Sequence, residues 1–178
     1  MLKMKILVTG SYGQLGSSLF KYLKSNVEIF WTGRNIPLSR NGFYLDICDR
    51  VNLKGLINLH EPDIVINLAA ITNVDFCEKK SDLAKEVNTN GVRNICDIFK
   101  GKIVQLSTDY VFDGKNGPYH EEDEVSPISV YGKTKLEAEK IITSHNSNNL
   151  IIRGNVLYDN CLNSRASFLN WVVQSLKE

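Results

Sequence analysis

A tyrosine and a lysine four residues apart are the residues of this sequence best suited to acid–base chemistry. Tyr131 and Lys135 lie in a segment that predicts a helix, because Ser129 can cap it and good helix formers follow. Side chains four apart lie over one another on one helix face. An ammonium group there lowers the tyrosine pKa from its usual value of about 10 toward neutral pH. The pair can donate a proton, although Tyr–Lys pairs at this spacing also occur by chance on solvent-facing helices.

A threonine is expected to join that pair from the end of a strand. Residues 102–107 form an apolar run typical of a buried strand, and Thr108 follows directly. Its hydroxyl can hydrogen-bond the oxygen that Tyr131 protonates. Thr108, Tyr131 and Lys135 are therefore candidate catalytic residues for the reduction of a carbonyl that receives a hydride.

The first part of the chain predicts a binding site for the phosphates of a dinucleotide. A strand over residues 4–9 leads into Gly10, Gly13 and Gly16, and a helix with leucines every four residues follows. Glycines let backbone N–H groups approach a pyrophosphate, and the helix N-terminus adds its positive end. The GxxGxxG spacing alone also fits a plain tight turn, so the prediction depends on the strand–loop–helix order.

The residue after the second strand favours NADP over NAD. A strand over residues 27–32 ends before Arg34, where NAD-binding domains carry an acidic residue. An arginine there can bind the 2′-phosphate of NADP, while a solvent-exposed loop arginine is the alternative. Next, a short strand is expected over residues 43–47, with Asp46 near its end. The Asp46 carboxylate can accept a hydrogen bond from the adenine amino group.

The middle of the chain supplies a second wall for the cofactor. A helix over residues 49–59 stops before a proline, and a buried strand over 63–70 follows. The small side chains of Ala69 and Ala70 at its end leave room for the cofactor's ribose and diphosphate.

The remaining elements continue the alternation of strands and helices. We expect one amphipathic helix over residues 74–100, with Asn88 bridging it to the active-site strand. A strand over 150–153 and a helix over 166–176 follow. This order predicts an α/β fold with a Rossmann-like, doubly wound parallel sheet in three αβα layers.

Composition and charge exclude several classes of partner. The chain has 178 residues, of which 43% are hydrophobic, with 21 basic and 20 acidic side chains. This balance fits one globular domain with neither nucleic acid nor a membrane as partner. The acidic run over 121–124 is typical of a solvated loop. No metal site is expected, because the four cysteines lack zinc-ligand spacing: Cys48, Cys77, Cys96 and Cys161. Their wide separation also fits a protein of the reducing cytoplasm.

Four blocks of sequence resemble the dTDP-4-dehydrorhamnose reductases, a family of extended short-chain dehydrogenases. They occur in family order and at family spacing over residues 10–16, 62–75, 107–114 and 130–136. The similarity extends from the N-terminus to about residue 158. It implies that residues 1–178 form an NAD(P)-binding Rossmann domain, and that most of the family's C-terminal substrate-binding portion is not included.

The resemblance also implies a reaction and a set of site residues. The reaction is reduction of the 4-keto group of a dTDP-4-keto-6-deoxyhexose by hydride from NADPH or NADH, with NADP favoured, in deoxysugar (rhamnose) biosynthesis. Thr108, Tyr131 and Lys135 fall on the family's catalytic residues. The implied cofactor contacts are Gly10, Tyr12, Gly13, Gln14, Leu15, Gly16, Arg34, Asp46, Ile47, Leu68, Ala69, Ala70, Thr72, Asn88, Tyr131 and Lys135.

Other functions stay open. The regulatory subunit of methionine adenosyltransferase resembles the same family and keeps much of the Tyr–Lys helix, so a non-catalytic NAD(P)-binding subunit is the alternative. An epimerase or a dehydratase on the same fold is disfavoured, and a dehydratase would carry an acidic pair in place of Thr108 and Asp109. The family usually has a hydroxyl residue and an aromatic after Arg153, and the departure here leaves the sugar open. A homodimer is plausible, because a short C-terminus exposes the substrate side.

Overall fold

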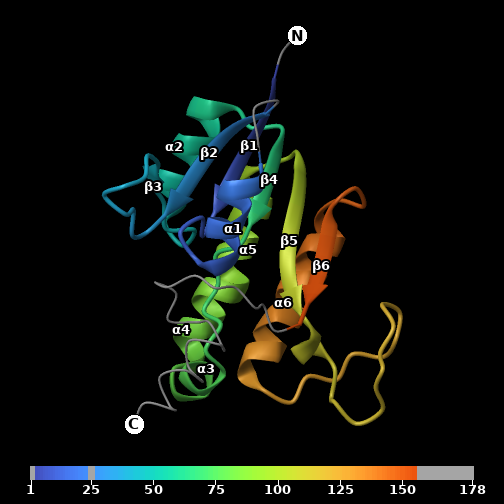
Figure 1. Cartoon of the computed structure of the whole chain (residues 1–178). Helices are drawn as coiled ribbons and strands as arrows, with labels where there is room; N and C mark the ends of the chain where they lie inside the picture. Colours follow the sequence, from blue (N-terminus) through green and yellow to red (C-terminus); the bar gives the residue numbers. More distant parts are fainter. Residues whose placement is uncertain (1–2, 24–26, 156–178) are drawn as a thin grey trace.

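The computed structural model describes residues 3–23 and 27–155. In this part of the chain six strands form one parallel sheet in the order β3-β2-β1-β4-β5-β6 (Figure 1). The expected Rossmann-like doubly wound arrangement is confirmed, with the reversal of strand order between β1 and β4. The strands are β1 (Met4–Thr9), β2 (Val27–Gly33), β3 (Phe43–Tyr44), β4 (Ile64–Asn67), β5 (Lys102–Thr108) and β6 (Leu150–Gly154).

Helices cover both faces of the sheet. In Figure 1, α1 lies in front of the strands, and α2, α5 and α6 lie behind them. The core lies on this second side, where Leu7, Val65 and Ile103 of three neighbouring strands pack against the helices. The α-helices are α1 (Gln14–Tyr22), α2 (Arg50–His60), α3 (Val74–Lys79), α4 (Ser81–Lys85), α5 (Gly91–Ile98) and α6 (Val130–His145).

Two strands end earlier than the sequence predicted. β3 stops at Tyr44 instead of residue 47, because its partner β2 itself ends at Gly33. β4 stops at Asn67 instead of residue 70, where the chain turns past the glycine loop. These early ends place Asp46 and the two alanines that follow Leu68 in loops at the carboxyl edge of the sheet.

The prediction of one helix over residues 74–100 is wrong. The chain breaks at Lys80 (φ −134°, ψ 56°), and a π-helical turn over Glu86–Asn90 separates α4 from α5. Asn88 lies in this turn and exchanges two hydrogen bonds with the backbone of Ile71, at 2.8 and 3.0 Å. Its Nδ2 also donates to Thr134 Oγ1 of α6 at 3.1 Å. Asn88 therefore joins a loop to α6 and not to the active-site strand. The break in the helix was not predicted, because the apolar stripe indicated only which face is buried.

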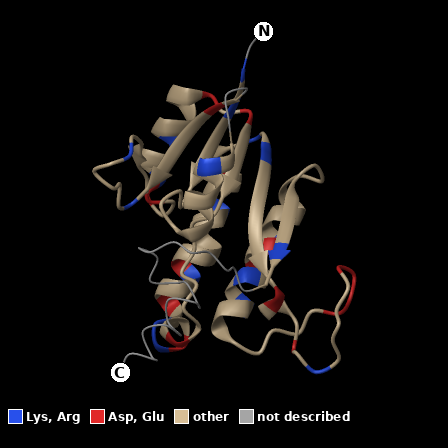
Figure 2. Ribbon diagram, in the orientation of Figure 1, with Lys and Arg blue, Asp and Glu red and all other residues tan. Residues whose placement is uncertain are grey.

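The C-terminal predictions lie outside the described residues, namely the helix over 166–176 and Cys161. Within residues 3–23 and 27–155, no helix is long and apolar enough to cross a membrane. Figure 2 shows basic and acidic residues interspersed over the ribbon, with an acidic run on the loop between β5 and α6. The four acidic residues of that run, 121–124, are exposed, as expected of a solvated loop.

Candidate functional site

A continuous groove follows the carboxyl edge of the sheet. It consists of two adjoining pockets whose walls share Gly10, Gly13, Leu68 and Ala70. We call them the Arg34 pocket and the Tyr131 pocket after a residue that each one contains. Loops at the carboxyl ends of parallel strands are where open α/β sheets bind their ligands.

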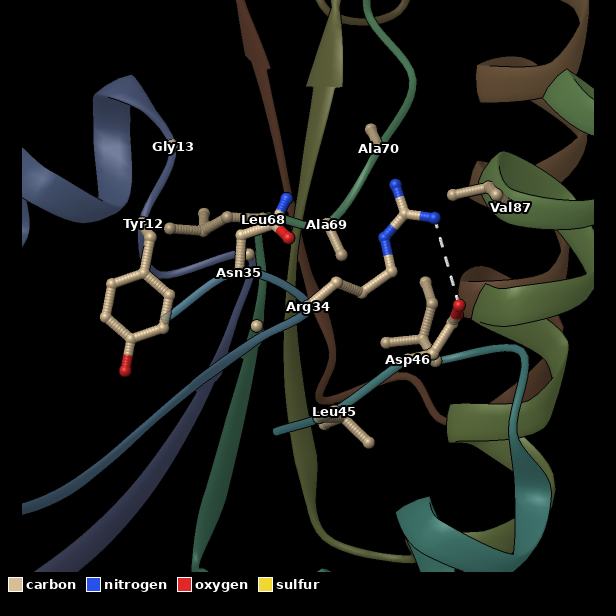
Figure 3. Close-up of a pocket in the computed structure, with 13 residues that line it drawn as sticks. Tyr12, Gly13, Arg34, Asn35, Leu45, Asp46, Leu68, Ala69, Ala70 and Val87 are labelled. Atoms are coloured by element: carbon tan, nitrogen blue, oxygen red, sulfur yellow. Dashed lines mark ion pairs between the residues drawn. The ribbon is translucent and has the colours of Figure 1, made fainter. Parts of the chain in front are cut away.

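The Arg34 pocket has a charged side chain across its floor (Figure 3). The guanidinium of Arg34 points toward Asp46, with 3.8 Å between Nη1 and Oδ2. The side chain of Arg34 is 57% exposed and that of Asp46 is 28% exposed, so solvent screens this ion pair. The expected cofactor residues in this wall are Gly10, Tyr12, Gly13, Arg34, Asp46, Ile47, Leu68, Ala69 and Ala70.

The glycine loop joins the two pockets and leaves the start of α1 open. Gly10 has a φ of +63°, and a Cβ there would lie 2.7 Å from Ala69 N and from Leu68 C. Only glycine therefore fits this turn. Gly13 is the N-cap of α1, and neither a side-chain cap nor an acidic residue in the first turn satisfies the helix N-terminus. The loop has the shape and polarity that a diphosphate group requires.

The Tyr131 pocket brings together the end of β5 and the start of α6. Ser129 caps α6 as predicted, accepting from Gly132 N at 3.0 Å. A Cβ on Gly132 would lie 2.2 Å from Tyr110 O, so α6 packs directly on the backbone that follows Thr108. The expected residues in the wall are Gly10, Gly13, Gln14, Leu15, Gly16, Leu68, Ala70, Thr72, Thr108 and Tyr131, and unpredicted ones include Ser107, Asp109, Tyr110, Gly154 and Asn155.

The pKa of Tyr131 differs from the expectation. Burial raises it above the usual value, and a hydrogen bond with Thr108 opposes that rise. Lys135 does not contribute the expected lowering, because its Nζ is directed to the backbone carbonyl of Leu106 at 2.6 Å. Tyr131, which lines the pocket, therefore keeps its proton at neutral pH and can donate a hydrogen bond.

Lys135 and Asn88 lie behind the groove and are absent from both pocket walls. Lys135 is 3% exposed, and burial lowers its pKa to about 8, while the nearby carboxylate of Glu139 opposes the shift. This lysine contacts the groove through Leu106, whose residue forms part of the wall. Lys135 can therefore lose its proton near pH 8 although its side chain is buried.

An unpredicted ion pair ties three elements together beside this lysine. Arg153 of β6 binds Glu139 of α6 through two hydrogen bonds, at 3.0 and 2.8 Å. Ser107 Oγ of β5 donates to the same carboxylate at 2.5 Å, and Arg153 also donates to Glu121 O at 2.9 Å. The partners lie 14 to 32 residues apart, so no local pattern indicated them. Among the described residues, no cluster of three or more His, Cys, Asp or Glu side chains can hold a metal ion.

Known proteins are similar to this chain over most of its length. Residues 4–178 match the family model described as the RmlD substrate binding domain. A dTDP-4-dehydrorhamnose reductase of Sinorhizobium fredii is 40% identical over 159 residues, which is 87% of this chain and 51% of that protein. The methionine adenosyltransferase 2 subunit beta of Danio rerio is 32% identical over 158 residues, 86% of this chain and 48% of that protein.

A solved structure agrees with these sequence relatives. The dTDP-4-dehydrorhamnose reductase from Bacillus anthracis, crystallised in complex with NADP, superposes with a TM-score of 0.87 at 30% identity. The match covers 99% of this chain and 60% of that one. The chain thus spans about half the length of the curated relatives it matches.

Proposed function

This chain belongs to the RmlD (dTDP-4-dehydrorhamnose reductase) family, and we propose that it binds NADP(H) and reduces the 4-keto group of a dTDP-4-keto-6-deoxyhexose. The main support is that Thr108 and Tyr131 lie in the same groove as the glycine loop. The proposed proton donor and the proposed diphosphate-binding loop would therefore belong to one site. The proposed role is a step in deoxysugar (rhamnose) biosynthesis.

The residues of the Arg34 pocket fit the adenosine half of a dinucleotide. The glycine loop and the start of α1 would hold the diphosphate, and Ala69 and Ala70 would line the ribose. Arg34 would release Asp46 and bind the 2′-phosphate, because a dianion is a stronger partner than a carboxylate held at 3.8 Å. Asp46 would then be free to accept from the adenine amino group.

The Tyr131 pocket would perform the proton transfer. Bound NADPH would supply the hydride. Tyr131, protonated because burial raises its pKa, would donate to the carbonyl oxygen while Thr108 orients that oxygen. Lys135 would act through Leu106, because its Nζ donates to the Leu106 carbonyl oxygen and would hold this part of the pocket wall in place beside Tyr131.

A second candidate is a non-catalytic NADP(H)-binding subunit. It is supported by the 32% identity to a methionine adenosyltransferase subunit, at a coverage close to that of the reductases. The two candidates share the cofactor groove and differ in turnover.

Turnover with and without the Tyr131 hydroxyl tests the proposal. We would mix the 178-residue chain with NADPH and a dTDP-4-keto-6-deoxyhexose and follow the loss of reduced-nicotinamide absorbance. Tyr131→Phe should lower kcat by about 10²- to 10⁴-fold, the usual range for a lost general acid, and leave the NADPH Kd unchanged. Tyr22→Phe, at an 80% exposed position, is the matched control.

The outcomes separate the candidates. NADPH binding without turnover would favour the non-catalytic subunit, and an active Tyr131→Phe variant would contradict the proposed acid. No binding would refute both. Light scattering on the same sample tests the expected homodimer.

A further inference from the structure

Three polar side chains form a row across the buried face of the sheet. Thr9, Asn67 and Gln105 are register partners on β1, β4 and β5. Each is at most 1% exposed. Because side chains of a strand alternate between faces, the row two residues earlier points to the same side. That earlier row is apolar and belongs to the core: Leu7, Val65 and Ile103.

Hydrogen bonds connect the polar row to the buried lysine. Thr9 Oγ1 donates to Asn67 Oδ1 at 2.5 Å, and Asn67 Nδ2 donates to Gln105 Oε1 at 2.8 Å. Gln105 Nε2 then donates to Leu106 O at 2.8 Å. The same carbonyl oxygen accepts from Lys135 Nζ at 2.6 Å. The chain of bonds thus begins one residue before the glycine loop and ends at the lysine behind the Tyr131 pocket.

An apolar row would fill this position at lower cost. Buried amides lose their hydration, and the hydrogen bonds that replace it return little net stability. The row immediately before it shows that aliphatic side chains pack well on this face. Fully satisfied polar networks specify one arrangement of the groups that they join, and here those groups belong to the two halves of the groove.

We propose that Asn67 and Gln105 are positioning residues that fix the Leu106 carbonyl, and through it the Lys135 side chain, relative to the glycine loop. The inference rests on the proposed function in one respect, that Lys135 is the lysine of the reaction. The placement of the lysine itself does not depend on any substrate.

An apolar replacement of the row isolates this role from packing. Thr9→Val/Asn67→Leu/Gln105→Met roughly keeps the side-chain volumes and removes all three polar side chains of the row, so none of the three is left without its partner in the row. Val65→Leu/Ile103→Met changes packing on the same strands, one row away, and leaves the polar row intact. It is therefore the matched control.

Acetylation of the free protein reports the position of Lys135 directly. We would label each variant with acetic anhydride and measure every lysine by peptide mass spectrometry, with exposed Lys133 and Lys140 of the same helix as internal references. In the polar-row variant we expect Lys135 to react about threefold to tenfold faster relative to these references, the equivalent of one hydrogen bond. The apolar-row control should leave the ratio unchanged.

If the polar-row variant folds and the acetylation ratio of Lys135 to the reference lysines is unchanged, the inference is overturned. A row with only a structural role would change the unfolding midpoint and leave that ratio as it is. If the triple variant does not fold, Thr9→Val alone removes the hydrogen bonds of the Thr9 hydroxyl with Asn67 and Ala69, and it should raise the ratio by a smaller factor. No rise in Thr9→Val would then overturn the inference.

Turnover distinguishes this inference from the proposed function. We expect kcat of the polar-row variant to fall about tenfold, as one lost positioning hydrogen bond allows, with little change in the KM for NADPH. A wild-type chain without turnover would refute the proposed reaction, and the acetylation ratio would still decide whether the row positions Lys135.

Discussion

The two ends of the groove differ in their solvent exposure and in their hydrogen bonding. In the Arg34 pocket an exposed arginine faces a partly exposed carboxylate across 3.8 Å, and solvent weakens the contact. Behind the Tyr131 pocket, Lys135 and the polar row are buried and are linked through Leu106 O by hydrogen bonds of 2.5 to 2.8 Å. The exposed end can change its partner at low cost, as a site that selects a cofactor must. The buried end cannot lose a group without leaving a neighbour unpaired, as suits a site that positions a proton.

Burial also acts oppositely on the pKa values of Tyr131, in the wall of the Tyr131 pocket, and of Lys135, behind that wall. It raises the pKa of Tyr131 and lowers that of Lys135, so both groups shift toward their neutral forms. The comparison therefore predicts that pH and substitution affect the two ends separately.

The largest effect is expected from removing the buried ammonium. Lys135→Met keeps the apolar stem and should lower kcat by about 10²-fold, because Leu106 O loses its partner and the wall of the Tyr131 pocket loses its position. Lys133→Met, on an exposed position of the same helix, should leave kcat unchanged. Steady-state kinetics of both variants make the test. Equal activity of wild type and Lys135→Met would mean that the buried end has no catalytic role.

A smaller effect is expected from pH. Because the pKa of Lys135 is about 8, kcat should fall as pH rises through 8, approaching about tenfold per unit. The NADPH-to-NADH preference should stay constant over that range, because Lys135 lies outside the Arg34 pocket. A preference that changes with kcat would break the separation of the two ends.

The lowered pKa of Lys135 also affects how the free energy of unfolding depends on pH. Its value in the folded chain, about 8, lies below the ordinary 10.5, so the unfolded chain binds more protons between these values. The contribution of Lys135 to the free energy of unfolding should therefore increase as pH rises from 8 to 10.5. Chemical denaturation of wild type and Lys135→Met across this range measures the difference.

The smallest effect is expected at the exposed end. Arg34→Ala should reduce the preference for NADPH over NADH by about tenfold, the size of one charge-assisted contact weakened by solvent. Turnover at saturating NADH should not change. Arg50→Ala is the matched control, since Arg50 pairs with Asp97 outside the groove. An unaltered preference in Arg34→Ala would show that Arg34 is a solvated loop residue.

The sequence alone determined the order of elements and most of the groove. The cap at Ser129, the glycines before α1 and the apolar runs of the strands all depend on residues that are neighbours in the chain. Parallel strands place their carboxyl ends at one edge, so residues predicted separately, such as Gly10 and Thr108, converge there.

The tertiary structure decided the break of the long helix at Lys80, the direction of the Tyr131 pKa shift and the partners of Lys135. No local pattern indicated the polar row or its connection to the lysine. These features depend on burial and on contacts such as Thr9 with Asn67, 58 residues apart. Local patterns encode which face of an element is buried, and only the packed fold decides what each buried group meets.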